Sequence, residues 1–451
     1  MIDLAGKNIS VIGAARSGLA AASVLKKHGA NVFLSEFGAI AKFTEAADSL
    51  NKQGIEFEFG GHTDRAFVCD LIITSPGVPS SSPVLTEAVR RNIKVISELE
   101  LGFQLCRGKV MAITGSNGKT TTTSLIGEIF NQSDITGTVA GNIGKPFVGV
   151  ADSIGPDNWA ILEVSTFQLE HIDKFKPDVA VVLNITPDHL DRHGSMENYI
   201  ALKMKVFANQ NGTNKSIINA DDDILKSYRG ASEVFSFSTR HEVDNGCFAK
   251  DDSIYLANHG NKAKLITSRD IGIQGPHNLS NACAACACCM AAGINNEAII
   301  KGLKTFKGVE HRLEKVGLIG GVSFINDSKA TNVDAVFWAL QSVPPPIVLI
   351  AGGRDKNSDF STLSELVKDK VKTIVLIGEA SDKIEAAFFG LTEICRAGSM
   401  EEAVRIAYEN AMPQGTVLLS PACASYDMFD NYEHRGQVYK QAVHMLIKEH
   451  R

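Results

Sequence analysis

The chain has 451 residues, of which 44% are hydrophobic and 21% are charged, and its formal net charge is −6. This length and composition predict a globular protein of about three domains. The acidic balance, without a long basic stretch, argues against nucleic acid as the main partner. The sequence contains no apolar run of about 18 residues, which a membrane span would need. No secretory signal pattern is visible, so we expect a cytoplasmic protein. The 9 cysteines, an odd number, favour reduced thiols.

Short apolar runs rich in valine and isoleucine recur along the chain, with helical segments between them. They show little alternation, which is typical of strands buried on both faces of a parallel sheet. The runs are Ile9–Ile12, Leu71–Thr74, Val110–Ile113, Ala160–Val164, Val179–Leu183, Ser216–Asn219, Val322–Ile325, Ile347–Ile350, Thr373–Ile377 and Val417–Leu419. Strand–helix alternation throughout predicts an α/β protein.

The predicted architecture has three domains, each a mainly parallel sheet with flanking helices. Their limits are residues 1–107 for a Rossmann-like domain, 108–309 for a central P-loop domain and 310–451 for a second Rossmann-like domain. Weaker periodicity over residues 230–270 is compatible with a small antiparallel sheet.

A glycine turn, Gly13-Ala14-Ala15-Arg16-Ser17-Gly18, follows the first predicted strand and precedes a helix. The dinucleotide fingerprint requires glycine where Ala15 stands, so this match is incomplete. Glu36 could accept a hydrogen bond from a ribose hydroxyl, and Ser75 follows another strand at the same sheet edge. The favoured interpretation is a phosphorylated ligand other than a dinucleotide; NAD binding and simple strand–helix packing are the alternatives.

A glycine loop from Thr114 to Thr121 joins the strand Val110–Ile113 to a predicted helix, Thr122–Phe130. Such a loop directs backbone N–H groups at phosphate over the helix N-terminus. Lys119 adds a cation, and the hydroxyl of Thr120 or Thr121 could hold Mg²⁺. Only two residues separate Gly115 from Gly118, whereas the usual motif has four. We expect a nucleoside triphosphate here.

Polar residues follow the next predicted strands, at Gly141-Asn142-Ile143-Gly144, at Glu163 and at Asp188-His189. In a parallel sheet these positions would face the phosphates. Glu163 is then a candidate Mg²⁺ ligand, and His189 could ligate a second ion. The alternative is that these are ordinary surface or capping residues.

Four cysteines cluster at Cys283, Cys286, Cys288 and Cys289 among alanines. A zinc or iron–sulfur site is one interpretation, but a helix cannot direct all four thiols at one ion. We expect a tightly packed helix in which cysteine acts as a small hydrophobic residue.

Taken together, the short phosphate loop, Gly141–Gly144, the Glu163 segment and Asp188-His189 resemble the Mur ligases, which build the peptide of bacterial cell-wall precursors. In the third predicted domain, three segments resemble the D-glutamate-adding branch: Asn326–Asn332, Gly352–Lys356 and Leu419–Asp427. The Asn-Pro-Arg signature expected of the diaminopimelate- or lysine-adding branch is absent from that domain. The resemblance implies an ATP-dependent ligase that joins D-glutamate to UDP-N-acetylmuramoyl-L-alanine through an acyl phosphate, in peptidoglycan synthesis.

The resemblance also implies a role for individual residues. Those expected around the UDP-substrate are Arg16, Ser17, Gly18, Ser35, Glu36, Ser75, Asn142 and His189. Those expected at ATP are Gly115, Ser116, Asn117, Gly118, Lys119, Thr120, Thr121, Asn278, Asn281, Arg312 and Asp327. Those expected at D-glutamate are Lys329, Thr331, Lys356, Ser425, Tyr426 and Tyr432. The catalytic set is Lys119, Glu163, His189 and Lys203, and two Mg²⁺ ions would use Thr120, Glu163, His189 and Lys203 as its carbamate.

The sequence departs from the family pattern at three places. Ser35-Glu36-Phe37 stands where Asp-Thr-Arg or a similar triplet is frequent, Ala15 replaces a glycine, and Tyr432 replaces a common phenylalanine. The base that deprotonates the amine is not identified, and His189 is a weak candidate. We expect a monomer. The alternatives are a folylpolyglutamate synthase-like ligase, a P-loop phosphotransferase, and a binding protein without chemistry.

Overall fold

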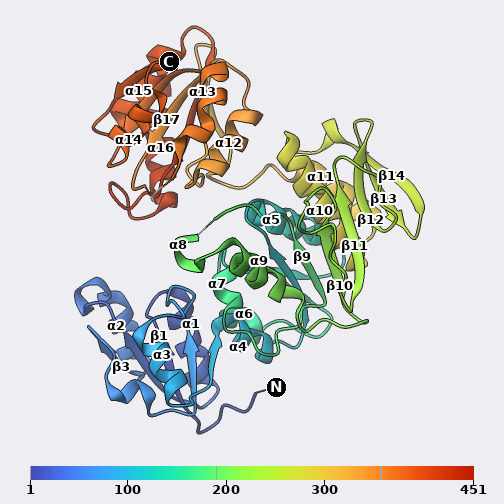
Figure 1. Ribbon diagram of the computed structural model, residues 1–451, viewed down its shortest axis with the longest axis vertical. Helices are drawn as coiled ribbons and strands as arrows, with labels where there is room; N and C mark the ends of the chain where they lie inside the picture. The colour runs from blue at the N-terminus through green and yellow to red at the C-terminus, as the bar shows by residue number, and fades with distance from the viewer. Residues whose placement is uncertain (1, 189, 356–357, 451) are drawn as a thin grey trace. The chain divides into compact units, whose positions relative to one another are not determined.

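The computed structural model describes residues 2–188, 190–355 and 358–450 (Figure 1). Two compact units divide the chain: residues 1–273 with 278–306, and residues 274–277 with 307–451. The three sheets of the described chain are mainly parallel, as the valine- and isoleucine-rich runs predicted. Among the described residues, no helix combines the length and apolar character needed to cross a bilayer.

The N-terminal sheet has the strand order β3-β2-β1-β4-β5, and every neighbouring pair is parallel. Its strands are β1 (Asn8–Ile12), β2 (Asn31–Glu36), β3 (Glu56–Phe59), β4 (Leu71–Thr74) and β5 (Val95–Ser97). Its helices are α1 (Arg16–Lys27), α2 (Thr44–Lys52), α3 (Pro83–Arg90) and α4 (Glu98–Leu105), with short 3₁₀ turns at Ile40–Lys42 and Asp64–Phe67. From β1 the chain forms β2 and β3 on one side and then β4 and β5 on the other. Such a switch point opens a crevice at the carboxyl ends of the strands.

The central sheet has the order β14-β13-β12-β11-β10-β9-β6-β8-β7. Its strands are β6 (Lys109–Thr114), β7 (Gly137–Gly141), β8 (Trp159–Glu163), β9 (Val179–Val182), β10 (Lys215–Asn219), β11 (Glu233–Ser238), β12 (Gly246–Lys250), β13 (Ser253–Asn258) and β14 (Asn261–Thr267). Pairing becomes antiparallel from β12 to β14. The antiparallel segment compatible with residues 230–270 is therefore present, but it extends the central sheet.

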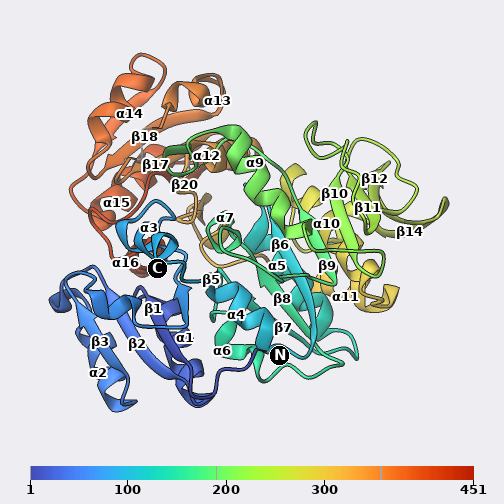
Figure 2. The same cartoon turned by 60° about the horizontal axis from the view of Figure 1, so that its bottom comes forward.

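Helices of the same region are α5 (Lys119–Asn131), α6 (Val148–Ala151), α7 (Thr166–Leu169), α8 (Leu190–His193), α9 (Met196–Met204), α10 (Pro276–Ala291) and α11 (Asn296–Thr305), with 3₁₀ turns at Lys205–Phe207 and Ser268–Asp270. Figure 2 shows α5 alongside β6 and β8, against which it packs. The four clustered cysteines lie on α10 and are fully buried, so the packed-helix prediction is confirmed.

The C-terminal sheet has the order β15-β16-β20-β17-β18-β19, parallel except for the β15–β16 pair. Its strands are β15 (Glu314–Ile319), β16 (Val322–Asn326), β17 (Ile347–Gly352), β18 (Val371–Ile377), β19 (Glu393–Arg396) and β20 (Gly415–Ala422). Its helices are α12 (Val333–Ser342), α13 (Ser364–Lys370), α14 (Ser381–Phe388), α15 (Met400–Ala411) and α16 (Tyr432–Glu449), with a 3₁₀ turn at Phe360–Leu363.

Both faces of this sheet are covered, as alternation along β17 shows. Ile347 and Leu349 pack in one apolar cluster with α12 and α13, whereas Val348 and Ile350 pack in another with α15 and α16. Successive strand residues point to opposite faces, so a continuous apolar run is what a doubly covered strand requires.

A buried carboxylate on α4 joins the N-terminal region to the central one. Glu100 is 0% exposed and accepts hydrogen bonds from the backbone N–H groups of Asp173, Lys174 and Phe175 at 2.8–3.0 Å. On the same helix, Glu98 accepts from Val148 N at 2.7 Å, and burial raises the pKa of Glu98 to about 7. The helix is thus held by backbone donors of the central region.

We expect Glu100→Ala to lower the free energy of unfolding of the first unit by about 3 kcal/mol, because three backbone N–H groups lose a buried acceptor. Urea denaturation followed by the fluorescence of Trp159, in a Trp338→Phe background, measures this. The exposed Glu45→Ala is the matched control and should change stability by less than about 0.5 kcal/mol. Equal stability of the two variants would contradict the role given to Glu100.

Candidate functional site

The phosphate loop lies between β6 and α5, and its glycines are required by backbone geometry. Gly118 has φ +83° at the N-cap of α5, and a Cβ there would overlap the side-chain oxygen of Asn281 on α10. Gly115 has φ +157°, and its Cβ would lie 2.9 Å from the Cβ of Leu183. The loop is therefore confined between α10 and the end of β9, at the N-terminus of α5, where the helix dipole favours an anion.

Ser116 and Asn117 hold the loop in place through their own hydrogen bonds. Asn117 N donates to the side-chain oxygen of Asn184 at 2.8 Å, and Asn184 Nδ2 donates back to Asn117 O at 3.1 Å. Ser116 Oγ donates to Thr186 O at 2.8 Å and lies 2.9 Å from the hydroxyl of Tyr199. Both residues thus fix the loop to the segment after β9.

Lys119 folds over the loop, where its Nζ donates to Gly115 O at 2.7 Å and to Ser116 O at 2.8 Å. Thr120 and Thr121, the next residues of α5, are buried. The Thr121 hydroxyl has no hydrogen-bond partner among the described residues. A cation and buried hydroxyls at a helix N-terminus suit a polyphosphate with its metal ion.

Glu163 ends β8 next to the phosphate loop, since it lies opposite Ile113 of β6 in the parallel register. The residue is 2% exposed, and its Oε1 accepts from Asn142 Nδ2 at 2.9 Å. Its Oε2 is buried without a hydrogen-bond partner among the described residues. A buried carboxylate oxygen left unpaired is costly unless a cation meets it, so this position fits a divalent ion with oxygen ligands.

Lys203 on α9 is 2% exposed, and its Nζ lies 4.5 Å from the ring centroid of Tyr199. Burial lowers the pKa of Lys203 well below its ordinary value; the charge of Lys119 lowers it further, and Asp188 opposes both. The Tyr199 hydroxyl contacts Ser116 of the phosphate loop. Lys203, Lys119 and Glu163 therefore belong to one edge of the central sheet, whereas His189 lies outside the described residues.

An open cavity of about 970 Å³ lies at the carboxyl edge of the N-terminal sheet. Of the residues predicted to bind the UDP-substrate, those that line it are Arg16, Ser17, Glu36, Ser75 and Asn142. The Glu36 carboxylate accepts from Ala14 N and Gly38 N, each at 2.7 Å, so the protein's own backbone already uses both of its oxygens.

Gly18 and Ser35 do not line this cavity. A Cβ on Gly18 would overlap the carbonyl oxygen of Gly13, so this glycine permits close packing of α1 on β1. Ser35 is 0% exposed, and its Oγ lies 2.6 Å from both Glu58 Oε1 and His62 Nδ1. Any effect of Ser35 on a ligand therefore passes through these neighbours.

The remaining predicted ATP residues divide between the two units. Asn278 and Asn281 lie one turn apart on α10, with Asn281 against the phosphate loop. Arg312 and Asp327 belong to the second unit and line a small pocket with His277 and Trp338. Burial raises the pKa of Asp327 to about 6, although Arg312 and the hydroxyl of Ser420, 2.8 Å away, oppose the shift.

Of the predicted D-glutamate residues, Lys329 and Thr331 lie in the loop after β16, Ser425 and Tyr426 lie in the loop after β20, and Tyr432 begins α16. Lys329 Nζ is 5.4 Å from the ring centroid of Tyr432, and Thr331 N donates to Lys329 O. Ser425 is buried, whereas Tyr426 is 65% exposed. Lys356 lies outside the described residues.

Arg435 on α16 is a buried residue that the motifs did not identify. It is 1% exposed and donates to Ser328 O at 2.8 Å, Ser328 Oγ at 3.0 Å and Cys423 O at 3.1 Å. It thereby joins the loop that carries Lys329 to the loop that carries Ser425. The signal was available, because Arg435 occupies an inward position of α16 in register with Tyr439 and Val443.

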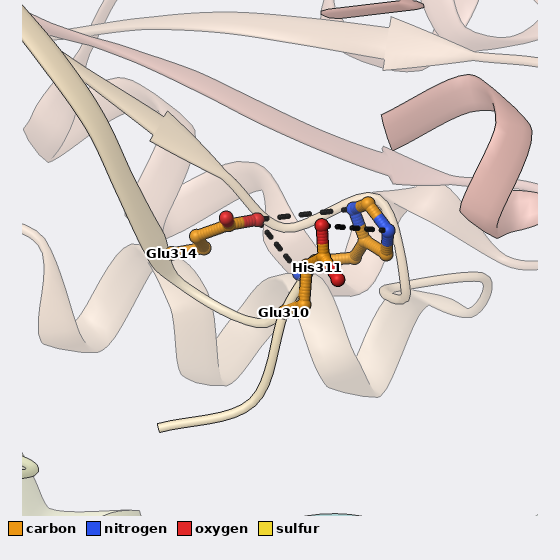
Figure 3. Close-up of side chains that lie close together, drawn as sticks. All are labelled: Glu310, His311 and Glu314. Carbon is orange, nitrogen blue, oxygen red and sulfur yellow. Dashed lines mark hydrogen bonds and ion pairs between the residues drawn. The ribbon is translucent and has the colours of Figure 1, made fainter. Parts of the chain in front are cut away.

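Glu310, His311 and Glu314 form a cluster of potential metal ligands in the second unit (Figure 3). Lys440 Nζ donates to Glu310 at 2.7 Å and to Glu314 at 2.6 Å, and Asn326 Nδ2 lies 2.9 Å from His311 Nδ1. Because Lys440 already pairs with both carboxylates, we interpret the cluster as a structural network around β15 and α16.

We expect Arg435→Lys to lower the free energy of unfolding of the second unit by about 3 kcal/mol, because lysine keeps the charge but cannot reach all three acceptors. The fluorescence of Trp338, in a Trp159→Phe background, reports this unit during urea denaturation. Arg405→Lys, at an exposed ion pair with Glu449, should cost less than about 1 kcal/mol. If both lysine variants unfold alike, Arg435 does not hold the two loops.

Three family models match the chain in order. They are the MurD N-terminal domain over residues 8–84, the Mur ligase middle domain over 113–289 and the Mur ligase glutamate ligase domain over 311–423. A Koribacter versatilis protein named UDP-N-acetylmuramoylalanine--D-glutamate ligase is 43% identical over 451 residues, which cover 99% of this chain and 99% of that protein. A Pelotomaculum thermopropionicum protein of the same name is 44% identical over 452 residues, 99% of each chain.

Solved structures share the fold at low sequence identity. A pseudomurein peptide ligase type C from Methanothermus fervidus has a TM-score of 0.63 and 20% identity, covering 98% of this chain and 100% of that one. A UDP-N-acetylmuramate-alanine ligase from Thermotoga maritima has a TM-score of 0.62 and 19% identity, with the same coverage. The three-domain α/β prediction is therefore confirmed.

Proposed function

The chain belongs to the Mur ligase family, and from that premise we propose that it joins D-glutamate to UDP-N-acetylmuramoyl-L-alanine with consumption of ATP. The observation that carries this proposal is the full-length similarity to D-glutamate ligases, together with one sheet edge that holds Lys119, Glu163 and Lys203. The reaction belongs to peptidoglycan precursor synthesis. The proposed division of labour is residues 1–107 for the UDP-substrate, 108–309 for ATP and 310–451 for the amino acid.

The chemistry follows from two obstacles. A carboxylate oxygen is a poor leaving group, and an ammonium is not a nucleophile. The alanyl carboxylate attacks the γ-phosphorus of ATP, forming a C–O–P acyl phosphate and releasing ADP. The deprotonated amine of D-glutamate then attacks the acyl carbon, and the tetrahedral intermediate expels phosphate.

The residues of the central edge bind and orient the triphosphate. Lys119 leaves the loop carbonyls to pair with phosphate oxygens, and the N–H groups of Gly118 to Thr121 surround the same charge. Thr120 and Glu163, whose Oε2 lacks a partner among the described residues, are the proposed magnesium ligands, together with His189 and modified Lys203 for a second ion. Magnesium supplies charge stabilisation at the transferred phosphoryl group.

Lys203 is proposed to carry a carbamate. Its buried environment favours the neutral amine, which is the form that adds to carbon dioxide. The amine nitrogen bonds to the carbon, one proton leaves, and the product is an anion. A neutral amine beside Lys119 is thereby replaced by an anion, which attracts the charge of Lys119.

In the second unit, the cations Lys329 and Lys356 are proposed to hold the D-glutamate carboxylates, with Thr331, Ser425, Tyr426 and Tyr432 as further contacts. Fixing the amine near the acyl carbon contributes much of the rate. The proposed partners are the three substrates alone, and the proposed state is a cytoplasmic monomer.

The first test is phosphate release from ATP in the presence of UDP-N-acetylmuramoyl-L-alanine and one acceptor at a time. D-Glutamate should support turnover, whereas L-glutamate, lysine and diaminopimelate should support less than about 1% of that rate. Hydroxylamine should trap a hydroxamate, which a phosphotransferase that makes stable phosphate esters would not yield. Preference for another acceptor would overturn the proposal.

The second test concerns Lys203. Lys203→Ala should lower kcat at least about 100-fold, because the proposed anion at the metal site is lost. Lys203→Glu, or added bicarbonate with the wild type, should alter the rate. Lys215→Ala, at a lysine outside this edge, should retain activity. Fully active Lys203→Ala enzyme would exclude the carbamate as a catalytic group.

A further inference from the structure

The wall of the N-terminal cavity contains a hydrogen-bonded relay that determines which ring nitrogen of His62 carries the proton. Ser35 and Glu58 are cross-strand neighbours on β2 and β3. Ser35 Oγ donates to Glu58 Oε1 at 2.6 Å, and His62 Nδ1 lies 2.6 Å from the same Oγ. Because a hydroxyl has one proton and Glu58 accepts it, Nδ1 of His62 carries the ring proton and donates to Ser35.

The carboxylate end of the relay is held ionised. Thr63 N and Thr63 Oγ1 donate to Glu58 at 3.0 and 2.6 Å. The pKa of Glu58 is lowered because these hydrogen bonds outweigh its partial burial. An ionised carboxylate only accepts hydrogen bonds, so the direction of the relay from His62 through Ser35 to Glu58 is fixed.

The imidazole is neutral near pH 7, since burial lowers the pKa of His62 against the opposing charges of Glu58 and Glu36. A neutral ring protonated at Nδ1 presents a lone pair at Nε2. Nε2 has no hydrogen-bond partner among the described residues, and His62 lines the cavity. The cavity wall therefore contains a hydrogen-bond acceptor, His62 Nε2, because Ser35 and Glu58 keep the ring proton on Nδ1.

An exposed aromatic ring accompanies this acceptor. Phe37 also lines the cavity and is 76% exposed, and its ring centroid lies 6.1 Å from that of His62. Phe37 follows β2, and His62 follows β3, both at the carboxyl edge where nucleotides bind in sheets of this kind. A large apolar side chain left this exposed beside a lone acceptor suits a flat heterocycle with an N–H edge.

We propose that Phe37 stacks on the base of the nucleotide substrate and that Nε2 of His62 selects uracil by accepting its N3–H. Uracil has a proton at N3, whereas cytosine has a lone pair there that would face the lone pair of Nε2. Ser35 and Glu58 act as positioning residues because they keep the proton on Nδ1. The inference rests on the proposed function, which supplies a uridine nucleotide as the ligand.

The test measures binding of UDP, CDP and 3-methyluridine diphosphate to the full-length chain by isothermal titration calorimetry. The wild type should bind UDP at least about 10-fold more tightly than either analogue. N3 of cytosine has no proton to donate to Nε2, and N3 of the methylated base carries a methyl group instead. His62→Phe, which keeps a ring but removes the acceptor, should reduce the UDP-to-CDP ratio to within about 3-fold.

Ser35→Ala should lower the same ratio while leaving most of the affinity, because the ring can then adopt either tautomer. Ser10→Ala, at another buried serine of the same sheet, is the matched control and should keep the wild-type ratio. Phe37→Ala should weaken UDP and CDP alike by about 10-fold, since stacking does not depend on the base edge. Imidazole ¹⁵N chemical shifts should report the Nδ1–H tautomer in the wild type and its loss in Ser35→Ala.

An unchanged UDP-to-CDP ratio in His62→Phe would overturn the inference while leaving the proposed function intact. Failure of the wild type to bind any uridine nucleotide would overturn both. Folding of each variant is checked by urea denaturation of the first unit.

Discussion

The parallel register of β7, β8, β6 and β9 is the constraint on which the central site depends. Gly141 lies opposite Glu163, Glu163 opposite Ile113, and Thr114 opposite Val182, so four strand ends meet along one line. The phosphate loop and the segment that leads to α9 begin at this line, and the Glu163 carboxylate lies on it. A slip of one residue in the pairing of β8 with β6 and β7 would turn Glu163 to the opposite face of the sheet.

Burial then gives these groups their chemical character. Lys203 and Glu163 would be ordinary charged side chains in water, but each is almost fully covered. The lysine responds with a lowered pKa, and the carboxylate is left with an oxygen that lacks a partner among the described residues. Both groups are therefore in an unfavourable environment that a bound ligand would improve. Perturbed ionisable groups of this kind are common at functional sites.

The sequence was a good guide where a single local pattern determines the outcome. Valine- and isoleucine-rich runs predicted the strands, and Gly115 and Gly118 located the glycine turn between β6 and α5. It was a poor guide where the outcome depends on strands far apart in the chain. Ser35 follows the pattern of a ligand contact, but its pairing with Glu58 draws its hydroxyl inward, away from the cavity. The inward position of Arg435 on α16 can be found from helical spacing, but its role as a structural cation depends on two loops that converge on it.

The two buried glutamates of α4 have a consequence for how such a protein can diversify. Glu98 and Glu100 bond to backbone groups near residues 148 and 173–175, so the N-terminal region and the central one share part of one interior. Exchange of the whole N-terminal region for a foreign one would leave those backbone donors without acceptors. New nucleotide preferences are therefore most accessible through single substitutions in the cavity wall, and recombination at this boundary is penalised by the fold itself.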